Sequence, residues 1–155
     1  MLAWTYGTPK LMSSYEFTNN EQGPPANDSG QTNDSTCFTG GWRCDHRWQV
    51  IANMVQFHNI VRGTAVTNWW DNGNDTIAFG RGNKGYLILN DEGSPVTGRS
   101  FQTALPAGVY CDVVHGDFAN NRCTGPAYTV DANGWFRADV QAQDGLALHA
   151  GAKLS

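Results

Sequence analysis

The chain has little charge and no long apolar run. Asp, Glu, Lys and Arg make up 15% of its 155 residues, and the formal net charge is −4. Basic residues do not form runs, so neither nucleic acid nor an anionic membrane surface is an expected partner. No apolar stretch approaches the ~20 residues that a membrane-spanning helix requires. The opening residues Met1–Trp4 lack the basic and apolar regions of a signal peptide, so we do not expect one here.

Recognisable catalytic and metal-binding motifs are also missing. Glu16, Glu21 and Glu92 are the only glutamates, and each lies in a loop-like context. No Gly-x-Ser-x-Gly nucleophile elbow occurs. The acidic turn 71–75 does not have the spacing of an EF-hand calcium loop. The sequence therefore predicts no catalytic residue and no metal site within this chain.

Glycine, by contrast, is abundant, with 18 residues distributed among Thr, Val and aromatic residues. This composition favours β structure with frequent turns. The stretch 68–90 contains two strand-like runs, 76–79 and 86–89, and between them Gly82-Asn83 can adopt the positive φ of a tight turn. Both faces of the hairpin are apolar, which is typical of strands covered on both sides. We therefore expect this hairpin at the centre of a sheet.

Short strands and turns continue to the end of the chain. The later strand-like runs are 99–104, 109–114, 127–130, 135–140 and 146–150. Seven or eight antiparallel strands at this spacing predict a mainly β fold, an antiparallel β-sandwich. Before them, an amphipathic helix is predicted over about 46–62, with Asp45 as its N-cap and Gly63 after its last turn. The apolar face of this helix consists of Val50, Ile51, Met54, Val55, Phe57, Ile60 and Val61.

The four cysteines are Cys37, Cys44, Cys111 and Cys123. Their even number and local spacing favour two disulfides, Cys37–Cys44 and Cys111–Cys123, and hence an oxidising compartment. The alternative is a zinc site with His46 and His115 as further ligands. Neither cysteine pair has the short C-x2-4-C spacing that structural zinc prefers, so disulfides are the favoured interpretation.

Motifs of one protein family occur in order along the whole chain. They are YGTPKLMSSYEF (6–17), CDHRW followed by NMVQFHNIV (44–61), NWWDNGNDTIAFGRGNKG (68–85), ALPAGVYCDVVHGD (104–117), Cys123-Thr124-Gly125 and LALHAGAKL (146–154). Together they resemble the last third of the animal-type, chloride-dependent α-amylases. The resemblance implies that residues 1–63 are the last unit of a (β/α)8 barrel, with one strand, a long polar loop over 18–36 and one helix. It also implies that residues 64–155 form a Greek-key β-sandwich, and it implies the same two disulfides.

The resemblance also indicates which parts of such an enzyme this chain lacks. Glycoside hydrolysis needs two carboxylates held across the scissile bond, and in this family they come from barrel strands that precede residue 1. Lys10 stands where the family places a basic residue that binds chloride, which tunes the pKa of a nearby general acid. Most ligands of the family's chloride and calcium ions also lie upstream of residue 1. Taken without the resemblance, Lys10 is a solvated lysine at a strand end.

Aromatic side chains suggest a second, non-catalytic function. Sugar rings stack on exposed aromatic faces, although tryptophan more commonly packs in a core. Trp69 and Trp70 are adjacent, so in a strand they face opposite sides, and one can lie in the core while the other meets the barrel, solvent or a sugar. The candidate sugar-stacking residues are Trp42, Trp69, Trp70 and Trp135.

The whole chain is thus predicted to be the C-terminal portion of a secreted α-amylase. The resemblance implies a parent reaction, endo-hydrolysis of α-1,4-glucosidic bonds in starch and glycogen. The chain alone is expected to be inactive and structural, and the alternative is a stand-alone α-glucan-binding module that uses exposed tryptophans. The expected partners are an α-glucan, a second copy of the chain, or a chain that supplies the missing barrel to residues 1–62. The expected location is extracellular.

Overall fold

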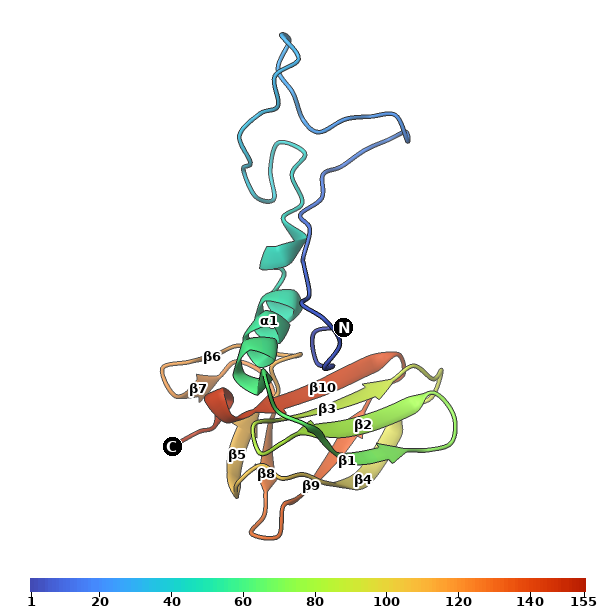
Figure 1. Cartoon of the computed structure of the whole chain (residues 1–155), viewed down its shortest axis with the longest axis vertical. Helices are drawn as coiled ribbons and strands as arrows, with labels where there is room; N and C mark the ends of the chain where they lie inside the picture. Colours follow the sequence, from blue (N-terminus) through green and yellow to red (C-terminus); the bar gives the residue numbers. More distant parts are fainter.

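The computed structural model describes all 155 residues, which form a β-sandwich with a helix projecting from it (Figure 1). Beyond the helix the chain extends into a long arm, residues 12–44. The helix α1 spans Gln49–Val61, and short 3-10 turns occur at Asp45–Arg47 (η1) and Ala150–Ala152 (η2). The strands are β1 (Val66–Asp71), β2 (Thr76–Arg81), β3 (Gly85–Asn90), β4 (Val96–Gln102), β5 (Gly108–Cys111), β6 (Phe118–Ala119), β7 (Arg122–Cys123), β8 (Ala127–Val130), β9 (Trp135–Val140) and β10 (Asp144–His149). No helix is long and apolar enough to cross a membrane.

The predicted hairpin is the centre of the main sheet. Strands β1, β2, β3 and β10 form a four-stranded antiparallel sheet in the order β1-β2-β3-β10. The turn between β2 and β3 uses Gly82, whose φ is +51°. Almost every residue of both strands is buried or half-buried, and only Leu89 is exposed. The prediction of a hairpin covered on both faces is therefore confirmed.

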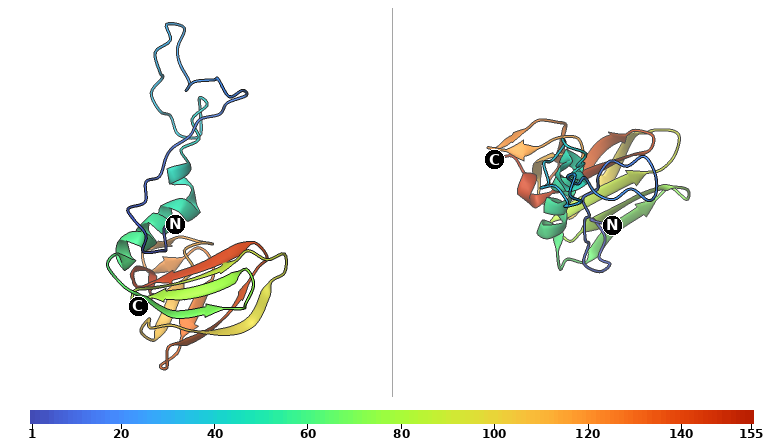
Figure 2. Two further views of the ribbon diagram at one scale, coloured as in Figure 1. Left: turned by 45° about the vertical axis from the view of Figure 1, so that its right-hand side comes forward. Right: turned by 90° about the horizontal axis from the view of Figure 1, so that it is seen from above.

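Two-stranded ladders form the rest of the sandwich. Strand β4 pairs with β9, and β5 pairs with β8, and together these ladders cover one face of the main sheet (Figure 2). The small β6–β7 hairpin lies beside helix α1 (Figure 1). The predicted strands 99–104 and 109–114 end earlier than expected, at Gln102 and Cys111. After Cys111 the chain leaves the sheet for an excursion that the Cys111–Cys123 disulfide closes.

The main sheet separates two hydrophobic cores. The first core lies between the sheet and the two ladders and contains Ala78, Tyr86, Ile88, Phe101, Leu105, Tyr110, Val130, Phe136, Ala138, Val140, Leu146 and Leu148. The second core lies between the sheet and helix α1 and contains Ala3, Phe57, Val61, Phe79, Leu87, Cys111, Val113, Ala147 and Ala152. Because the second core takes residues from both sides of position 63, the two predicted domains share it, and their separation remains a prediction.

Helix α1 sits directly on strand β3 because position 85 has no side chain. A Cβ atom at Gly85 would lie 2.6 Å from Cγ1 of Val61 and 2.9 Å from Cζ of Phe57, which is too close for real atoms. Phe57 and Val61 are completely buried as a result. Asn53 fixes the other end of the helix by donating hydrogen bonds to the carbonyl oxygens of Val113 (3.1 Å) and Gly116 (2.9 Å).

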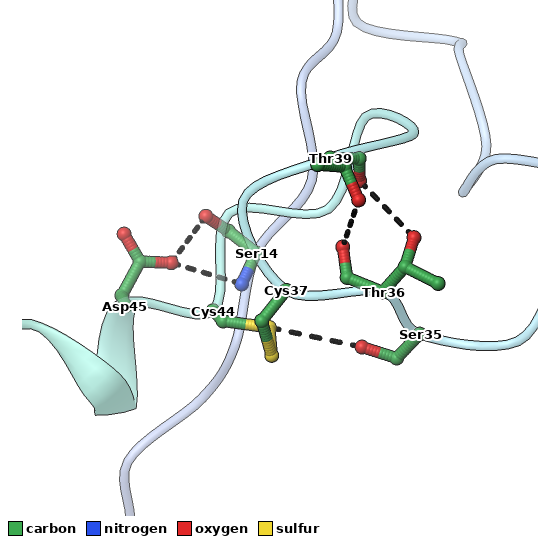
Figure 3. Close-up of a disulfide and its surroundings, with 7 residues drawn as sticks. All are labelled: Ser14, Ser35, Thr36, Cys37, Thr39, Cys44 and Asp45. Atoms are coloured by element: carbon green, nitrogen blue, oxygen red, sulfur yellow. Dashed lines mark hydrogen bonds between the residues drawn. A yellow bond between two sulfur atoms is a disulfide. The ribbon is translucent and has the colours of Figure 1, made fainter.

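The start of the helix differs from the prediction. Asp45 begins the 3-10 turn η1, and α1 itself follows Trp48 without a side-chain cap. The Asp45 carboxylate instead accepts hydrogen bonds from the backbone N (3.0 Å) and Oγ (2.5 Å) of Ser14, which lies in another segment (Figure 3). Of the seven residues in the predicted apolar face, only Phe57 and Val61 are fully buried, because the sheet covers one side of the helix alone.

The strand expected within residues 1–17 does not form. This segment runs alongside helix α1 (Figure 1). Its only β pairing is an isolated bridge between Tyr15 and Trp42. A strand needs a neighbour to satisfy its backbone groups, and no other barrel strand is present. Residues 18–36 form the predicted surface loop, at the end of the arm that lies farthest from the sandwich (Figure 2).

Candidate functional site

Three of the four candidate tryptophans surround one hollow at an edge of the sandwich. The hollow has a volume of about 190 Å³ and is lined by Asn68, Trp69, Trp70, Tyr86, Arg99, Ser100, Phe101, Gln102 and Trp135. It lies where the edge strand β1 meets the β4–β9 ladder. The register of that ladder places Trp135 directly opposite Gln102. The fold therefore brings together residues that are separated by more than sixty positions in the sequence.

An irregularity in β1 orients the two adjacent tryptophans. The β1–β2 register shifts between Thr67 and Trp70, and Asn68 adopts a φ of +49°. Trp70 then packs edge-on against Phe101 of the first core, with ring centroids 5.4 Å apart. Trp69 lies on the other side of the strand and stacks on Phe79, with ring centroids 6.0 Å apart. The expected opposite orientation of these two residues is observed.

The three indole rings differ in whether a ligand can reach them. Trp69 is 51% exposed, but it packs against both Phe79 and Trp4, and its Nε1 donates to the Asp71 carboxylate (2.9 Å). The Arg99 guanidinium carbon lies 4.1 Å from the Trp70 ring centroid, a cation–π contact that covers this indole. Trp135 is 43% exposed, and no aromatic or cationic side chain stacks on it. Trp135 is therefore the open aromatic platform of the site.

A second hollow continues from the first. It has a volume of about 610 Å³ and is lined by Trp70, Asn72, Val96, Thr97, Gly98, Arg99 and Ser100. Trp70, Arg99 and Ser100 line both hollows, so the two hollows adjoin at these residues. Arg99, Asn68 and Gln102 supply polar groups next to the aromatic platform, an arrangement that suits a hydroxyl-rich ligand.

Trp42, the fourth candidate, lies apart from this site. It is half-buried in the arm, where its ring contacts Tyr15 edge-on at 6.2 Å, and its buried Nε1 has no hydrogen-bond partner. Sequence reasoning did not single out Arg99, Asn68 or Gln102. They join the site through the pairing of distant strands, for which the local sequence contains no signal.

The cysteines are all oxidised in this structure. Cys37–Cys44, drawn in Figure 3, is a disulfide with a Cα–Cα distance of 5.2 Å. Cys111–Cys123 is a disulfide with a Cα–Cα distance of 5.6 Å, and no free cysteine remains. They leave no thiolate for the alternative zinc site. His115 binds two aspartates instead, and no group of three or more His, Cys, Asp or Glu residues is arranged to hold a metal ion.

Lys10 and the glutamates do not assemble into a reactive centre. Lys10 is exposed and forms no hydrogen bond or ion pair, and its role in binding chloride stays a prediction. Glu16 and Glu21 lie exposed in the arm. Glu92 accepts hydrogen bonds from Nδ2 of Asn72 and from Oγ1 of Thr76, and these bonds lower the pKa of its carboxyl group. An ionised carboxylate held in this way supports a turn and is unsuited to act as a general acid.

Comparison with known proteins gives a consistent family assignment. Residues 67–151 match the family model described as the α-amylase C-terminal all-beta domain. An α-amylase from Streptomyces violaceus is 50% identical over 152 residues, which cover 98% of this chain and 24% of that protein. An α-amylase from Tribolium castaneum is 47% identical over 163 residues, which cover 99% of this chain and 33% of that protein.

Solved structures agree with the sequence comparison. Wild-type α-amylase I from Eisenia fetida superposes with a TM-score of 0.89 at 42% identity, over 96% of this chain and 33% of that chain. A mutant of the same enzyme, in a complex with maltohexaose, superposes with a TM-score of 0.88. This chain thus spans about a quarter to a third of the length of these relatives. On these grounds, the chain belongs to the α-amylase C-terminal all-β domain family.

Proposed function

We propose that this chain acts as the C-terminal portion of a secreted α-amylase and that its own role is structural. The observation that carries the proposal is the second core, in which Phe57 and Val61 of α1 are fully buried against the main sheet. Through this core the sandwich holds the helix that, by the family resemblance, is the last helix of a catalytic barrel. The parent reaction is endo-hydrolysis of α-1,4-glucosidic bonds, with the two carboxylates supplied by the barrel.

The exposed apolar residues of the first fifty positions support this role. Tyr6 is 86% exposed, Met12 79% and Phe17 62%. Large apolar side chains gathered on one segment are typical of a surface that another chain or domain covers. The partner is a chain that supplies the missing barrel to residues 1–62. In that assembly Lys10, exposed and unpaired here, contributes one donor to a chloride site whose other ligands lie outside this chain, as do those for calcium.

Secretion fits the cysteine chemistry. Disulfides persist in oxidising compartments and are rare in the cytosol, and every cysteine of this chain is in a disulfide.

The first test is an activity measurement on the purified chain. We expect no release of reducing sugar from soluble starch above background, because this chain holds no pair of carboxylates across a substrate cleft. A complete α-amylase assayed in parallel is the positive control. Sugar release that survives repurification and scales with the concentration of the chain would contradict the proposal.

A second candidate function is α-glucan binding at the Trp135 site. The observation that favours it is the grouping of the open Trp135 ring with Arg99, Asn68 and Gln102 around two connected hollows. An exposed indole covers the apolar face of a sugar ring, and the neighbouring polar side chains reach its hydroxyl groups.

Retention on insoluble starch tests this second function. If Trp135 is the platform, Trp135→Ala should weaken retention roughly tenfold, the equivalent of about 1.4 kcal/mol of binding free energy. Trp42→Ala is the matched control and should leave retention unchanged, because Trp42 lies in the arm. If the unchanged chain is not retained on starch, α-glucan binding is excluded and only the structural role stands. Equal losses of retention in both variants would exclude Trp135 as the specific platform.

A further inference from the structure

One row of residues across the main sheet lies directly beneath helix α1. Gly85 on β3 is the cross-strand partner of both His149 on β10 and Arg81 on β2. Side chains at directly opposite positions emerge on the same face of a sheet. Here that face is the one that carries α1, since the hypothetical Cβ of Gly85 would strike Phe57 and Val61. The helix therefore rests on the gap at Gly85, with one polar side chain on each side of it.

Arg81 is held by the segment that it helps to dock. The residue is only 3% exposed, and its guanidinium donates hydrogen bonds to the carbonyl oxygens of Ala3, Thr64 (3.0 Å) and Val61 (3.4 Å). Val61 is the last residue of α1, where the helix dipole is negative and favours a cation. The charge of Arg81 is thus compensated only while the N-terminal segment and the helix are in place.

His149, on the other side of Gly85, has no such compensation. It is 1% exposed, its ring contacts Phe57 edge-on at 6.0 Å, and neither ring nitrogen has a hydrogen-bond partner. Burial lowers the pKa of His149 to about 4. The ring therefore fits its site only in the neutral form, because a buried charge without a partner is costly.

The charged groups around His149 do not offset a proton on it. The elements packed around the ring contribute His58 from α1, Arg62 directly after α1, Arg81 from β2, Lys84 before β3 and Lys153 after η2. Asp112 after β5 already binds His115 and the backbone N–H groups of Val114 and Ala147, and Asp144, at the opposite end of β10 from His149, also binds His115. A protonated His149 would add a second buried cation to the row that holds Arg81.

We propose that the row His149–Gly85–Arg81 is an acid-sensitive latch, which holds helix α1 and the N-terminal segment on the sandwich and releases them when His149 is protonated. The released state exposes the ring and returns it to an ordinary histidine pKa near 6.5. Between pH 6.5 and 4 the released state therefore binds more protons than the docked state, so docking weakens as the pH falls. The first core lies on the opposite face of the sheet and keeps the sandwich folded.

Hydrogen exchange of the full chain, corrected for the intrinsic rate at each pH, tests the latch. Protection of the α1 amides should fall roughly a hundredfold between pH 7.5 and 4.5, while protection of the β9 amides is maintained. Constant protection of α1 would overturn the proposal. A simultaneous loss of amide protection in α1 and β9 would also overturn the proposal, because that result means global unfolding.

Two variants separate the latch from other acid effects. His149→Phe keeps an aromatic ring but cannot be protonated, so α1 protection should no longer depend on pH, whereas the matched control His115→Asn should keep the dependence. A pH-dependent loss that persists in His149→Phe contradicts the proposal. Gly85→Ala tests the close approach of α1 to β3 without any change in protonation. It also provides a test in the case in which His149→Phe does not fold. Its Cβ should lift the helix and remove α1 protection already at pH 7.5 with β9 still protected, and unchanged α1 protection would overturn the docking argument.

Discussion

His115 lies between two carboxylates and titrates in the opposite sense to His149. Its Nδ1 is 2.6 Å from Oδ2 of Asp112, and its Nε2 is 3.0 Å from Oδ2 of Asp144. Burial alone would lower the pKa of His115, but the hydrogen bond and charge of Asp112, together with the charge of Asp144, outweigh it and raise that pKa. The folded state therefore binds the proton more tightly than the unfolded state. This contribution to stability is complete below about pH 6.5 and is lost as the pH rises through the raised pKa.

The substitution His115→Asn should lower the free energy of unfolding at pH 6 by about 1 kcal/mol or less. The effect is small because the side chain is 40% exposed and solvent screens its ion pairs. The difference between the variant and the unchanged chain should shrink by pH 9, where the ring is neutral in both states. Urea denaturation at the two pH values measures it. A difference that grows with pH would show that the aspartates do not stabilise the charged ring.

Residue roles could be predicted from sequence only where they follow from local alternation. The opposite orientation of Trp69 and Trp70 is such a case, because successive strand residues alternate between faces. The ion pairs of His115 could not be predicted in this way, since His115 lies in a turn and Asp144 follows it by 29 positions, at the start of β10. The cation–π contact of Arg99 with Trp70 also depends on how two separate sheets meet.

At the scale of elements, strands that contain their own turn signals were the most predictable. The runs 127–130 and 135–140 coincide with β8 and β9, because Ala132-Asn133-Gly134 fixes the turn between them. The prediction of a strand within residues 1–17 was wrong for the opposite reason. A strand needs a neighbouring strand to pair with, and no local signal in the sequence can provide one. The prediction of Asp45 as the helix N-cap was wrong because its carboxylate accepts hydrogen bonds from Ser14, which lies in a distant segment.

The two disulfides should differ in their effect on the sandwich. Cys111 is 1% exposed in the second core, and its bond to Cys123 closes the excursion that carries the β6–β7 hairpin. Replacing both of these cysteines by alanine should lower the free energy of unfolding by about 3 kcal/mol. The same double replacement at Cys37 and Cys44, which lie in the arm, should leave the sandwich unaffected.

Thermal denaturation followed by near-ultraviolet circular dichroism measures both double variants. The pair at positions 37 and 44 serves as the control for loss of a disulfide in general. Equal shifts in the melting temperature of the two variants would show that the arm and the sandwich unfold as one cooperative unit.

For the molecule as a whole, the exposed apolar residues of the N-terminal segment predict self-association. Each large apolar side chain gains roughly 1.5–3 kcal/mol on full burial, and Tyr6, Met12 and Phe17 are still largely in water. In the absence of a barrel, we expect a dimer or larger assembly through residues 1–62 at high concentration. Sedimentation at increasing concentration measures it, and Tyr6→Ser/Met12→Ser should weaken the association. A strict monomer at every concentration would contradict this expectation.

The overall architecture could be predicted from composition, strand spacing and family motifs. The packing across the predicted domain boundary at position 63 could not. Position 63 marks the change from helix to strands, which is visible in the sequence as Gly63. The core beneath α1 crosses this position, because Gly85 lets Phe57 and Val61 reach strand β3. Such a contact depends on the absence of a side chain at one point of the sheet, and no periodicity reveals it.

The arm also determines how the molecule responds to proteases. Residues 18–36 are exposed apart from the half-buried Pro25, and exposed polar loops of this kind are preferred sites of cleavage. Both Cys37 and Cys44 follow this loop, so no disulfide spans a cut within it. The released N-terminal peptide would still be bound through the contacts of Ala3 with Arg81 and of Ser14 with Asp45. A nicked chain would therefore remain one particle in native buffer and separate into two fragments on a denaturing gel, even without a reducing agent.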